Sequence, residues 1–444
     1  MEAPSVASSP AGVPAGTAAP TPGSSAAAAG SPADWPVYHR DAARSGSDPG
    51  FTQPAGVLTV EWSAALDGAV YAEPLVVGGR IIAATENDSV YALAASGHVA
   101  WRRHLGTPVP LASLPCGNID PLGITGTPAY DRSTGSLFAV AEVSGPRHVL
   151  FALDPGTGAV RWSRGIDLPG DDPAAHQQRA ALAVANGYVY VGLGGLDGDC
   201  GQYVGEVVGV PVTGVGPTVS YRVPTARMGG VWATGGPAVG ADGNLYVSVG
   251  NGASTTTYDG TDSVLELSPS LRLLSRFAPS TWSSENAADA DLGSLAPALL
   301  GDSFVFIDGK GGTAHTLRQG SLGGIGGQVS SIPLCRAFGA AAVAGQTVYV
   351  PCTDALRAVV VGTDGSMRVA WRTTSGANGP PVVGGGSVWS LDLTDGVLYR
   401  LAARSGTPTG HVAVGAVPHF ASPTLWNGRV LVGTMRGVVA VWAG

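Results

Sequence analysis

A repeated four-strand unit is the feature that most constrains what this chain of 444 residues can fold into. From residue 57 onward, an apolar strand follows Gly or Pro, strands of the types xVYVx and xVxAL come next, and the last strand carries Trp. One copy reads "AEPLVVGGRIIAATENDSVYALAASGHVAWRRHL" (72–105), and residues 126–166 repeat it with Trp162 in the place of Trp101. A unit of this size buries its apolar faces only by stacking against its neighbours, so the pattern predicts an array of packed sheets.

The array contains seven complete units and two incomplete ends. The third to seventh units cover residues 179–224, 232–278, 293–333, 338–373 and 379–415. Residues 419–444 supply only three strands, whereas "LTVEWSAAL" (58–66) is an unpaired Trp-bearing fourth strand. If the two ends pair, they complete an eighth unit and remove the exposed edges of an open array. We therefore predict an all-β, eight-bladed β-propeller of four-stranded blades, with the ring closed by an N-terminal strand.

The composition agrees with this architecture and excludes several classes of partner. The chain is 44% hydrophobic and 13% charged, with 67 Gly and 33 Pro, so it can bury a large core that turns interrupt throughout. Its net charge of -8 and the lack of a basic cluster argue against nucleic acid as a partner. Gly, Pro or a charge interrupts every apolar run before it reaches the roughly 20 residues that span a bilayer.

The first 34 residues differ from the rest. They are rich in Ala, Pro, Gly and Ser and carry almost no charge, which is typical of a disordered tether, so we place the propeller at residues 35–444. Such a tether commonly follows the export signal or lipid anchor of a secreted protein, although no signal-peptide pattern is present in it. The four cysteines form no CxxC or CxxCH motif and fit an oxidising compartment. We expect an extracellular or cell-envelope-attached protein.

Polar side chains are expected to gather on one face of the ring. In a four-stranded blade, the loop before the innermost strand and the loop between the second and third strands share a face. The residues that this rule places there are Glu86, Asn87, His176, Gln177, Gln178, Arg179, Asp197, Asp199, Trp232, Asn251, Asn286, Asp289, Asp291, Lys310, Asp354, Asp392 and His419. All four cysteines lie on these loops too. Of the three possible pairings, Cys335 with Cys352 and Cys116 with Cys200 is the most economical, and it would staple loops around a mouth.

The repeat "ALDPGTGAVRW" (152–162) resembles the tryptophan-docking unit of the quinoprotein superfamily, whose cofactor is pyrroloquinoline quinone (PQQ). The resemblance covers nearly the whole folded chain. That superfamily includes alcohol and polyvinyl-alcohol dehydrogenases, and also cofactor-free envelope scaffolds such as the outer-membrane assembly propeller lipoprotein. The fold alone does not choose between an enzyme and a scaffold.

Residues 229–269 and 282–317 are similar in order and spacing to the active-site half of the PQQ alcohol dehydrogenases, with the clearest match to the polyvinyl-alcohol branch. The resemblance implies that Trp232 stacks on the quinone, that Asn251 ligates calcium, and that Asp289 or Asp291 is the catalytic base. It gives Lys310, the only lysine of the chain, the role of hydrogen-bonding the reactive quinone carbonyl. Arg179 is assigned to cofactor binding with them. These residue types suit hydride transfer from an alcohol, because a carboxylate removes the hydroxyl proton and a fixed cation stabilises a developing oxyanion.

This chain departs from that family at three points. The adjacent-cysteine pair that caps the quinone is absent, and the calcium-ligating glutamate of blade three is out of register, so Asp197 or Asp199 would take its place. No CxxCH haem module is present, so electrons would leave to a separate acceptor. Two further interpretations stay open. One is a non-enzymatic cell-envelope propeller that binds a protein or glycan through its loop face. The other is a hydrolase that uses His176, although no GxSxG motif supports it.

Overall fold

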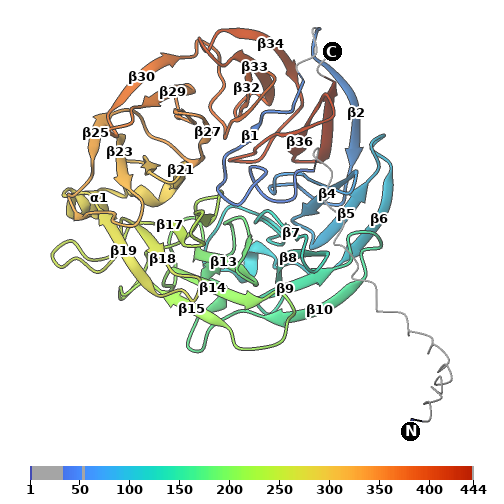
Figure 1. Ribbon diagram of the computed structural model, residues 1–444, viewed down its shortest axis with the longest axis horizontal. Helices are drawn as coiled ribbons and strands as arrows, with labels where there is room; N and C mark the ends of the chain where they lie inside the picture. The colour runs from blue at the N-terminus through green and yellow to red at the C-terminus, as the bar shows by residue number, and fades with distance from the viewer. Residues whose placement is uncertain (3–33, 53–55, 443–444) are drawn as a thin grey trace.

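The computed structural model describes residues 1–2, 34–52 and 56–442. Its sheets form a ring of eight blades, each with four antiparallel strands in its core, and every repeat boundary expected from the sequence encloses one blade (Figure 1). The predicted fold class is therefore confirmed. The predicted tether, residues 1–34, lies outside the described residues except at its ends.

The strands of the first four blades are β3 Leu75–Val77, β4 Arg80–Thr85, β5 Ser89–Leu93 and β6 Val99–His104; β7 Ala129–Asp131, β8 Ser136–Val143, β9 Arg147–Leu153 and β10 Val160–Gly165; β12 Ala183–Ala185, β13 Tyr188–Gly195, β14 Glu206–Pro211 and β15 Val219–Arg222; and β16 Ala238–Val239, β17 Leu245–Val249, β18 Ser263–Leu267 and β19 Leu273–Ala278. The strands of the last four are β21 Ala298–Leu300, β22 Phe304–Ile307, β23 Thr313–Arg318 and β25 Ser330–Pro333; β27 Ala342–Ala344, β28 Thr347–Val350, β29 Arg357–Val361 and β30 Met367–Arg372; β31 Val382–Gly384, β32 Ser387–Asp392, β33 Val397–Ala402 and β34 Pro408–Ala413; and β35 Thr424–Trp426, β36 Arg429–Thr434, β37 Gly437–Trp442 and β2 Thr59–Ala65.

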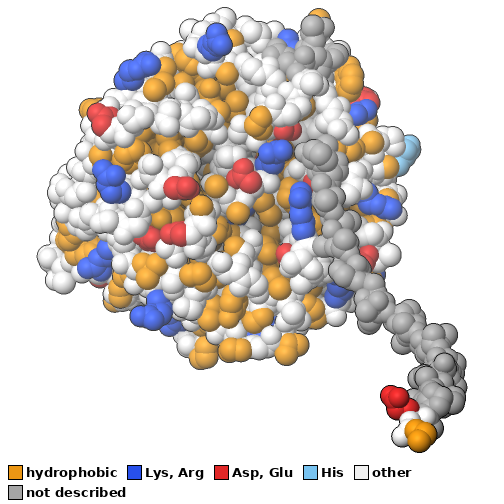
Figure 2. All heavy atoms as spheres, in the orientation of Figure 1, with side chains coloured by type: hydrophobic (Ala, Val, Ile, Leu, Met, Phe, Trp, Pro, Cys, Tyr) orange, Lys and Arg blue, Asp and Glu red, His pale blue; other side chains and the backbone are white. Residues whose placement is uncertain are grey.

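Short elements lie outside the four-stranded cores of the blades. They are β1 Ser47–Asp48, β11 His176–Gln177, β20 Leu295–Ala296, β24 Gly324–Ile325, β26 Gly339–Ala340, the helix α1 Trp282–Ala288, and the 3-10 turns η1 Leu111–Ser113, η2 Pro173–Ala175 and η3 Leu292–Ser294. No helix in the described part of the chain is long and apolar enough to cross a membrane. On the face that Figure 2 presents, acidic side chains lie near the middle with basic side chains beside them and around the rim, so this face shows no continuous basic surface.

Burial follows the position of a strand within its blade. The second and third strands are almost wholly buried, as in β17 and β18, because apolar sheets cover both of their faces. The outer strands alternate between half-buried and exposed residues, as in β15 and β34. The ring therefore has its core between the blades, and its outer circumference faces solvent.

The tryptophan of the repeat joins one blade to the next. Trp101 Nε1 donates a 3.0 Å hydrogen bond to the Pro155 carbonyl of the following blade, and the indole lies against Gly158. Gly158 has a φ of +70°, and a Cβ there would lie 2.5 Å from the ring, so only glycine fits. Trp62 and Trp371 donate to Ala95 and Ala403 in the same way. The repeat therefore has glycine at position 158 because the Trp101 indole of the preceding blade packs against it.

The last sheet joins the two ends of the sequence. Strand β2 pairs antiparallel with β37, from Thr59 opposite Trp442 to Ala65 opposite Gly437. Glu61 and Arg429 form a two-point ion pair across this sheet, at 2.6 and 2.8 Å. The orphan strand expected from the sequence therefore lies against the C-terminal strands, as β2 does beside β36 in Figure 1.

A segment that the repeat pattern does not explain, residues 34–48, contacts the inner strands of successive blades. We call it the axial strap. Its backbone bonds to Val76, Tyr130, Val239, Val343 and Val383 in blades one, two, four, six and seven. Arg44, which is 2% exposed, donates to the carbonyls of Tyr38, Leu182 and Pro237. Tyr38 packs among alanines that precede the first strands of blades three to six, which include Ala233 and Ala340, so the strap fills the centre of the ring.

Candidate functional site

A cavity of about 700 Å³ opens where the loop-face residues converge. Its charged side chains are Arg179, Asp197, Asp199, Asp289 and Lys310, its aromatic side chains are Tyr203, Trp232, Phe338 and Phe420, and Asn118, Gln177, Leu196, Met228, Asn251, His419, Gly195 and Gly198 complete the lining. The loops after β13, β17 and β22 contribute Asp197 and Asp199, Asn251 and Lys310. Seven of the eight predicted site residues therefore line one cavity, and Asp291 is the exception.

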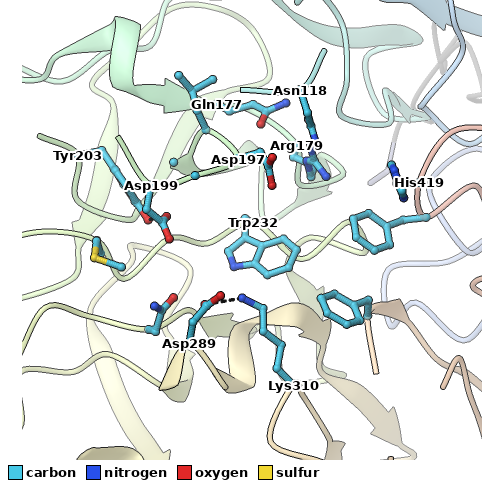
Figure 3. A pocket seen from close by; sticks show the side chains of 17 residues that line it. Asn118, Gln177, Arg179, Asp197, Asp199, Tyr203, Trp232, Asp289, Lys310 and His419 are labelled. Atoms are coloured by element: carbon cyan, nitrogen blue, oxygen red, sulfur yellow. Dashed lines mark hydrogen bonds and ion pairs between the residues drawn. The ribbon is translucent and has the colours of Figure 1, made fainter. Parts of the chain in front are cut away.

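Trp232 packs against the backbone of two glycines, Gly194 and Gly250. A Cβ at Gly194 would lie 2.9 Å from Trp232 Cβ, and one at Gly250 would lie 3.1 Å from the indole Nε1. These contacts fix one side of the indole against glycine-rich loops. In Figure 3, Trp232 occupies the middle of the cavity, with Asp197 on one side and Lys310 on the other. The half-buried ring can therefore serve as a flat floor for a planar ligand.

Lys310 lines the cavity and forms ion pairs with two aspartates. Its Nζ lies 2.6 Å from Asp289 Oδ1 and 2.8 Å from Asp291 Oδ2, and 5.6 Å from the centre of a Trp232 ring (Figure 3). Burial lowers the pKa of the ammonium, but the two carboxylates outweigh this effect and raise it above its ordinary value. Lys310 is therefore a fixed positive charge that lies between the two aspartates and the Trp232 ring.

The two aspartates have different environments. The side chain of Asp289, which follows helix α1 in a left-handed conformation, is 63% exposed and faces the cavity. Asp291 is fully buried, and its backbone carbonyl accepts the Lys310 N–H at 3.0 Å. Burial raises the pKa of Asp291, while the Lys310 ammonium opposes that rise. Asp289 is thus placed to meet a ligand, whereas Asp291 holds Lys310 from behind.

Arg179 reaches the cavity from a segment anchored by buried ionic groups. The preceding N–H, of Gln178, donates to Glu142 at 2.6 Å. Glu142 lies 3.6 Å from His148, which also bonds Asp167 at 2.6 Å. Burial lowers the pKa of His148, but Glu142 and Asp167 outweigh it and raise the value to about 10, so the ring is a buried imidazolium. This network explains why the Arg179 segment holds one position at the edge of the cavity.

The predicted metal ligands lie on the acidic side of the cavity. The side chains of Asn251 and Asp197 form no hydrogen bond with other described residues, whereas Asp199 accepts one from the Tyr203 hydroxyl. Free carboxylate and amide oxygens are the donors that calcium prefers. The His, Cys, Asp and Glu groups of the described residues that converge closely enough to hold a metal are instead Asp171, His176 and Glu206. Arg222 already pairs with both carboxylates of that cluster, at 2.5 Å for Glu206.

Two disulfides fix loops of this face. Cys116 is bonded to Cys200 and Cys335 to Cys352, which confirms the pairing favoured by the sequence. The first bridge ties the segment before Asn118 to the loop that carries Asp199. The cavity wall that would hold a cation is thus covalently held.

Several lining residues were not expected from the sequence, namely Asn118, Tyr203, Met228, Phe338 and Phe420. Phe338 and Phe420 stack on each other with ring centres 5.8 Å apart, and each lies within 6.4 Å of the Trp232 ring. A signal for both was available, because they precede the first strands of blades six and eight as Trp232 precedes that of blade four. An aromatic at this repeat position points toward the centre of the ring.

Comparisons with known proteins agree with this architecture. A family model described as outer membrane protein assembly factor BamB matches residues 59–197. No curated protein sequence matches the chain. Among solved structures, the quinohemoprotein alcohol dehydrogenase of Comamonas testosteroni is 17% identical with a TM-score of 0.70, over 92% of this chain and 80% of that one.

Two further solved structures have a similar fold. A europium-containing methanol dehydrogenase is 15% identical with a TM-score of 0.69, over 93% of this chain and 98% of that one. BamB from Moraxella catarrhalis is 18% identical with a TM-score of 0.61, over 87% of this chain and 99% of that one. At these identities the likeness establishes the fold, and the polyvinyl-alcohol branch stays a prediction. By its ring and its repeats, the chain is an eight-bladed β-propeller.

Proposed function

We propose that the cavity is the active site of a quinoprotein dehydrogenase that binds PQQ and calcium and oxidises an alcohol or polyol. One observation carries this proposal: a flat indole, a fixed ammonium and the exposed Asp289 carboxylate meet at one wall of a single cavity, and the buried Asp291 carboxylate holds the ammonium from behind. A structural scaffold has no need for this combination, because a buried ion pair stabilises a fold weakly.

The residues present fit such a cofactor. The Trp232 face offers a floor for a planar ring system, and Lys310 and Arg179 supply positive charge for an acidic quinone. Asn251 and Asp197 have free side-chain oxygens for a calcium ion, with Asp199 beside them. Three aspartates against two cations leave the cavity lining with a negative balance, which favours the uptake of a divalent cation.

The chain would supply binding and proton transfer, and the bound quinone would accept the hydride. Asp289 is the side chain placed to take the hydroxyl proton, because its carboxylate is exposed to the cavity. Lys310 keeps its proton and would stabilise negative charge that develops on an oxygen within its reach. Asp291 would act by fixing the position of Lys310. The reduced cofactor would need a separate electron acceptor.

The similar proteins include both enzymes and the assembly factor BamB. Two of the similar structures are alcohol dehydrogenases, whereas the family model is described as an assembly factor. That match favours a second candidate function, a cofactor-free envelope propeller that binds a protein or glycan on the same face. The two disulfides fit an extracellular or cell-envelope location for either function.

Reconstitution of the full chain with PQQ and calcium tests the proposal. We expect quinone absorbance to remain with the protein after desalting, and an alcohol to reduce the bound quinone. Trp232→Leu should lower quinone retention at least tenfold, whereas Trp282→Leu, a matched change in helix α1 outside the cavity, should not. Lys310→Ala should abolish turnover, and Lys310→Arg should retain part of it. If the parent protein retains no quinone, the scaffold function replaces this proposal.

A further inference from the structure

A second cavity of about 340 Å³ adjoins the first. Three side chains, those of Phe338, His419 and Phe420, line both cavities, so the two spaces meet at the stacked phenyl rings. The remaining wall comes from loops of blades six and seven, including Pro351, Pro380 and Leu393. None of the roles described above uses this space.

The walls of the second cavity are held in place before any ligand arrives. The disulfide Cys335–Cys352 joins the segment before Phe338 to the loop that carries Pro351 and Thr353. Thr353 N–H donates to the Arg336 carbonyl at 2.9 Å. Asn378 accepts the Leu393 N–H at 3.0 Å and donates to the Thr353 carbonyl at 3.3 Å, so its amide braces both loops. Preorganised walls of this kind favour binding, because less order has to be imposed by the ligand.

Phe420 is held in an unusual backbone conformation at the junction. Its φ is +65°, a region that bulky residues rarely adopt. The conformation presents the ring between the Phe338 ring and the Arg179 guanidinium, which lies 5.7 Å from the Phe420 ring centre. Backbone strain of this kind is concentrated at binding and active sites.

The chemistry of the lining indicates what the second cavity takes. It contains no carboxylate, lysine or arginine, and His419 is its single titratable side chain. Thr353 and Thr394 are exposed, and their hydroxyls form no hydrogen bond with other described residues. Apolar aromatic and proline side chains beside free hydroxyls suit a ligand that alternates C–H groups with hydroxyl groups.

We infer that the second cavity is a subsite for an uncharged oligosaccharide chain, whose terminal hydroxyl reaches the main cavity past Phe338 and Phe420. The identity of that hydroxyl as the reacting group rests on the proposed function, whereas binding of the chain does not. A monosaccharide would occupy the main cavity alone, and a longer chain would fill both.

Calorimetry on the full chain without cofactor tests the subsite. We expect maltohexaose to bind at least tenfold more tightly than glucose. Thr353→Trp, which fills the second cavity from an exposed position, should remove that advantage and leave glucose binding unchanged. Thr213→Trp, at another exposed threonine, in the turn between β14 and β15, should change neither.

Several outcomes would overturn the inference. The first is that the parent protein binds glucose and maltohexaose with equal affinity. The second is that Thr353→Trp binds maltohexaose as tightly as the parent protein does. The third is that 1-octanol or charged hexagalacturonate binds more tightly than maltohexaose. The proposed function fails separately. Chain-length-dependent binding with no quinone retention would keep the subsite and reject the dehydrogenase, and quinone-dependent oxidation with no chain-length dependence would do the reverse.

Discussion

Replacing Lys310 by Met should destabilise the protein through the carboxylate that it leaves behind. Asp291 is fully buried, and Lys310 Nζ lies 2.8 Å from its Oδ2. At an effective dielectric constant of about 20, two charges at this separation attract by about 6 kcal/mol, much of which offsets the cost of burying them. Removing one partner of a buried pair typically costs about 3–5 kcal/mol, so we expect a loss of about 3 kcal/mol in the free energy of unfolding at pH 7.

The loss should depend on pH in a defined direction. Burial already raises the pKa of Asp291, and without the ammonium that pKa rises further. A carboxyl whose folded pKa exceeds its unfolded value contributes full stability below the unfolded value and loses it as the pH rises through the folded value. The deficit of Lys310→Met should therefore be small near pH 4 and grow toward pH 8.

Urea unfolding at a series of pH values measures this effect. Asp291→Asn in the Lys310→Met background should restore most of the lost stability, because no buried charge then lacks a partner. Asp289→Asn is the matched control, and because Asp289 is 63% exposed we expect it to cost less than about 1 kcal/mol. If Lys310→Met costs less than about 0.5 kcal/mol at pH 7, or if its deficit grows toward low pH, the reasoning is wrong.

Three other outcomes follow from the geometry. Serine at both Cys116 and Cys200 should weaken calcium binding several-fold in calorimetry by freeing the loop with the predicted ligands; serine at the other two cysteines should not. Arg44→Met should lower the free energy of unfolding by about 2–4 kcal/mol, because three buried carbonyls lose their donor; a change within about 0.5 kcal/mol would contradict this. His148 has a folded pKa of about 10, so its contribution is full below about pH 6.5 and is lost as the pH rises through 10. His148→Asn should flatten the melting temperature between pH 6 and 10, and an unaltered profile would refute the imidazolium.

The sequence determined the parts of this protein that depend on local pattern. Strand period, turn glycines and the repeated Trp predicted eight four-stranded blades, and the loop rule placed Trp232 and Lys310 on one face. The packing of the Trp101 indole on Gly158 shows why the fold could be predicted, since each blade contacts the next through residues that recur at one spacing. Disulfide pairing could be favoured for the same reason, because blade order limits which loops can meet.

The tertiary structure decided what lies across the ring axis. The axial strap carries no repeat, and its contacts with six blades through backbone groups and Arg44 leave no periodic trace in the sequence. Burial distinguished Asp289 from Asp291, which lie two positions apart and were equivalent candidates in the sequence. The second cavity likewise arises where Phe338 and Phe420, more than 80 residues apart, stack together. Distances and burial across a closed ring depend on all of its blades at once, and the local sequence does not encode them.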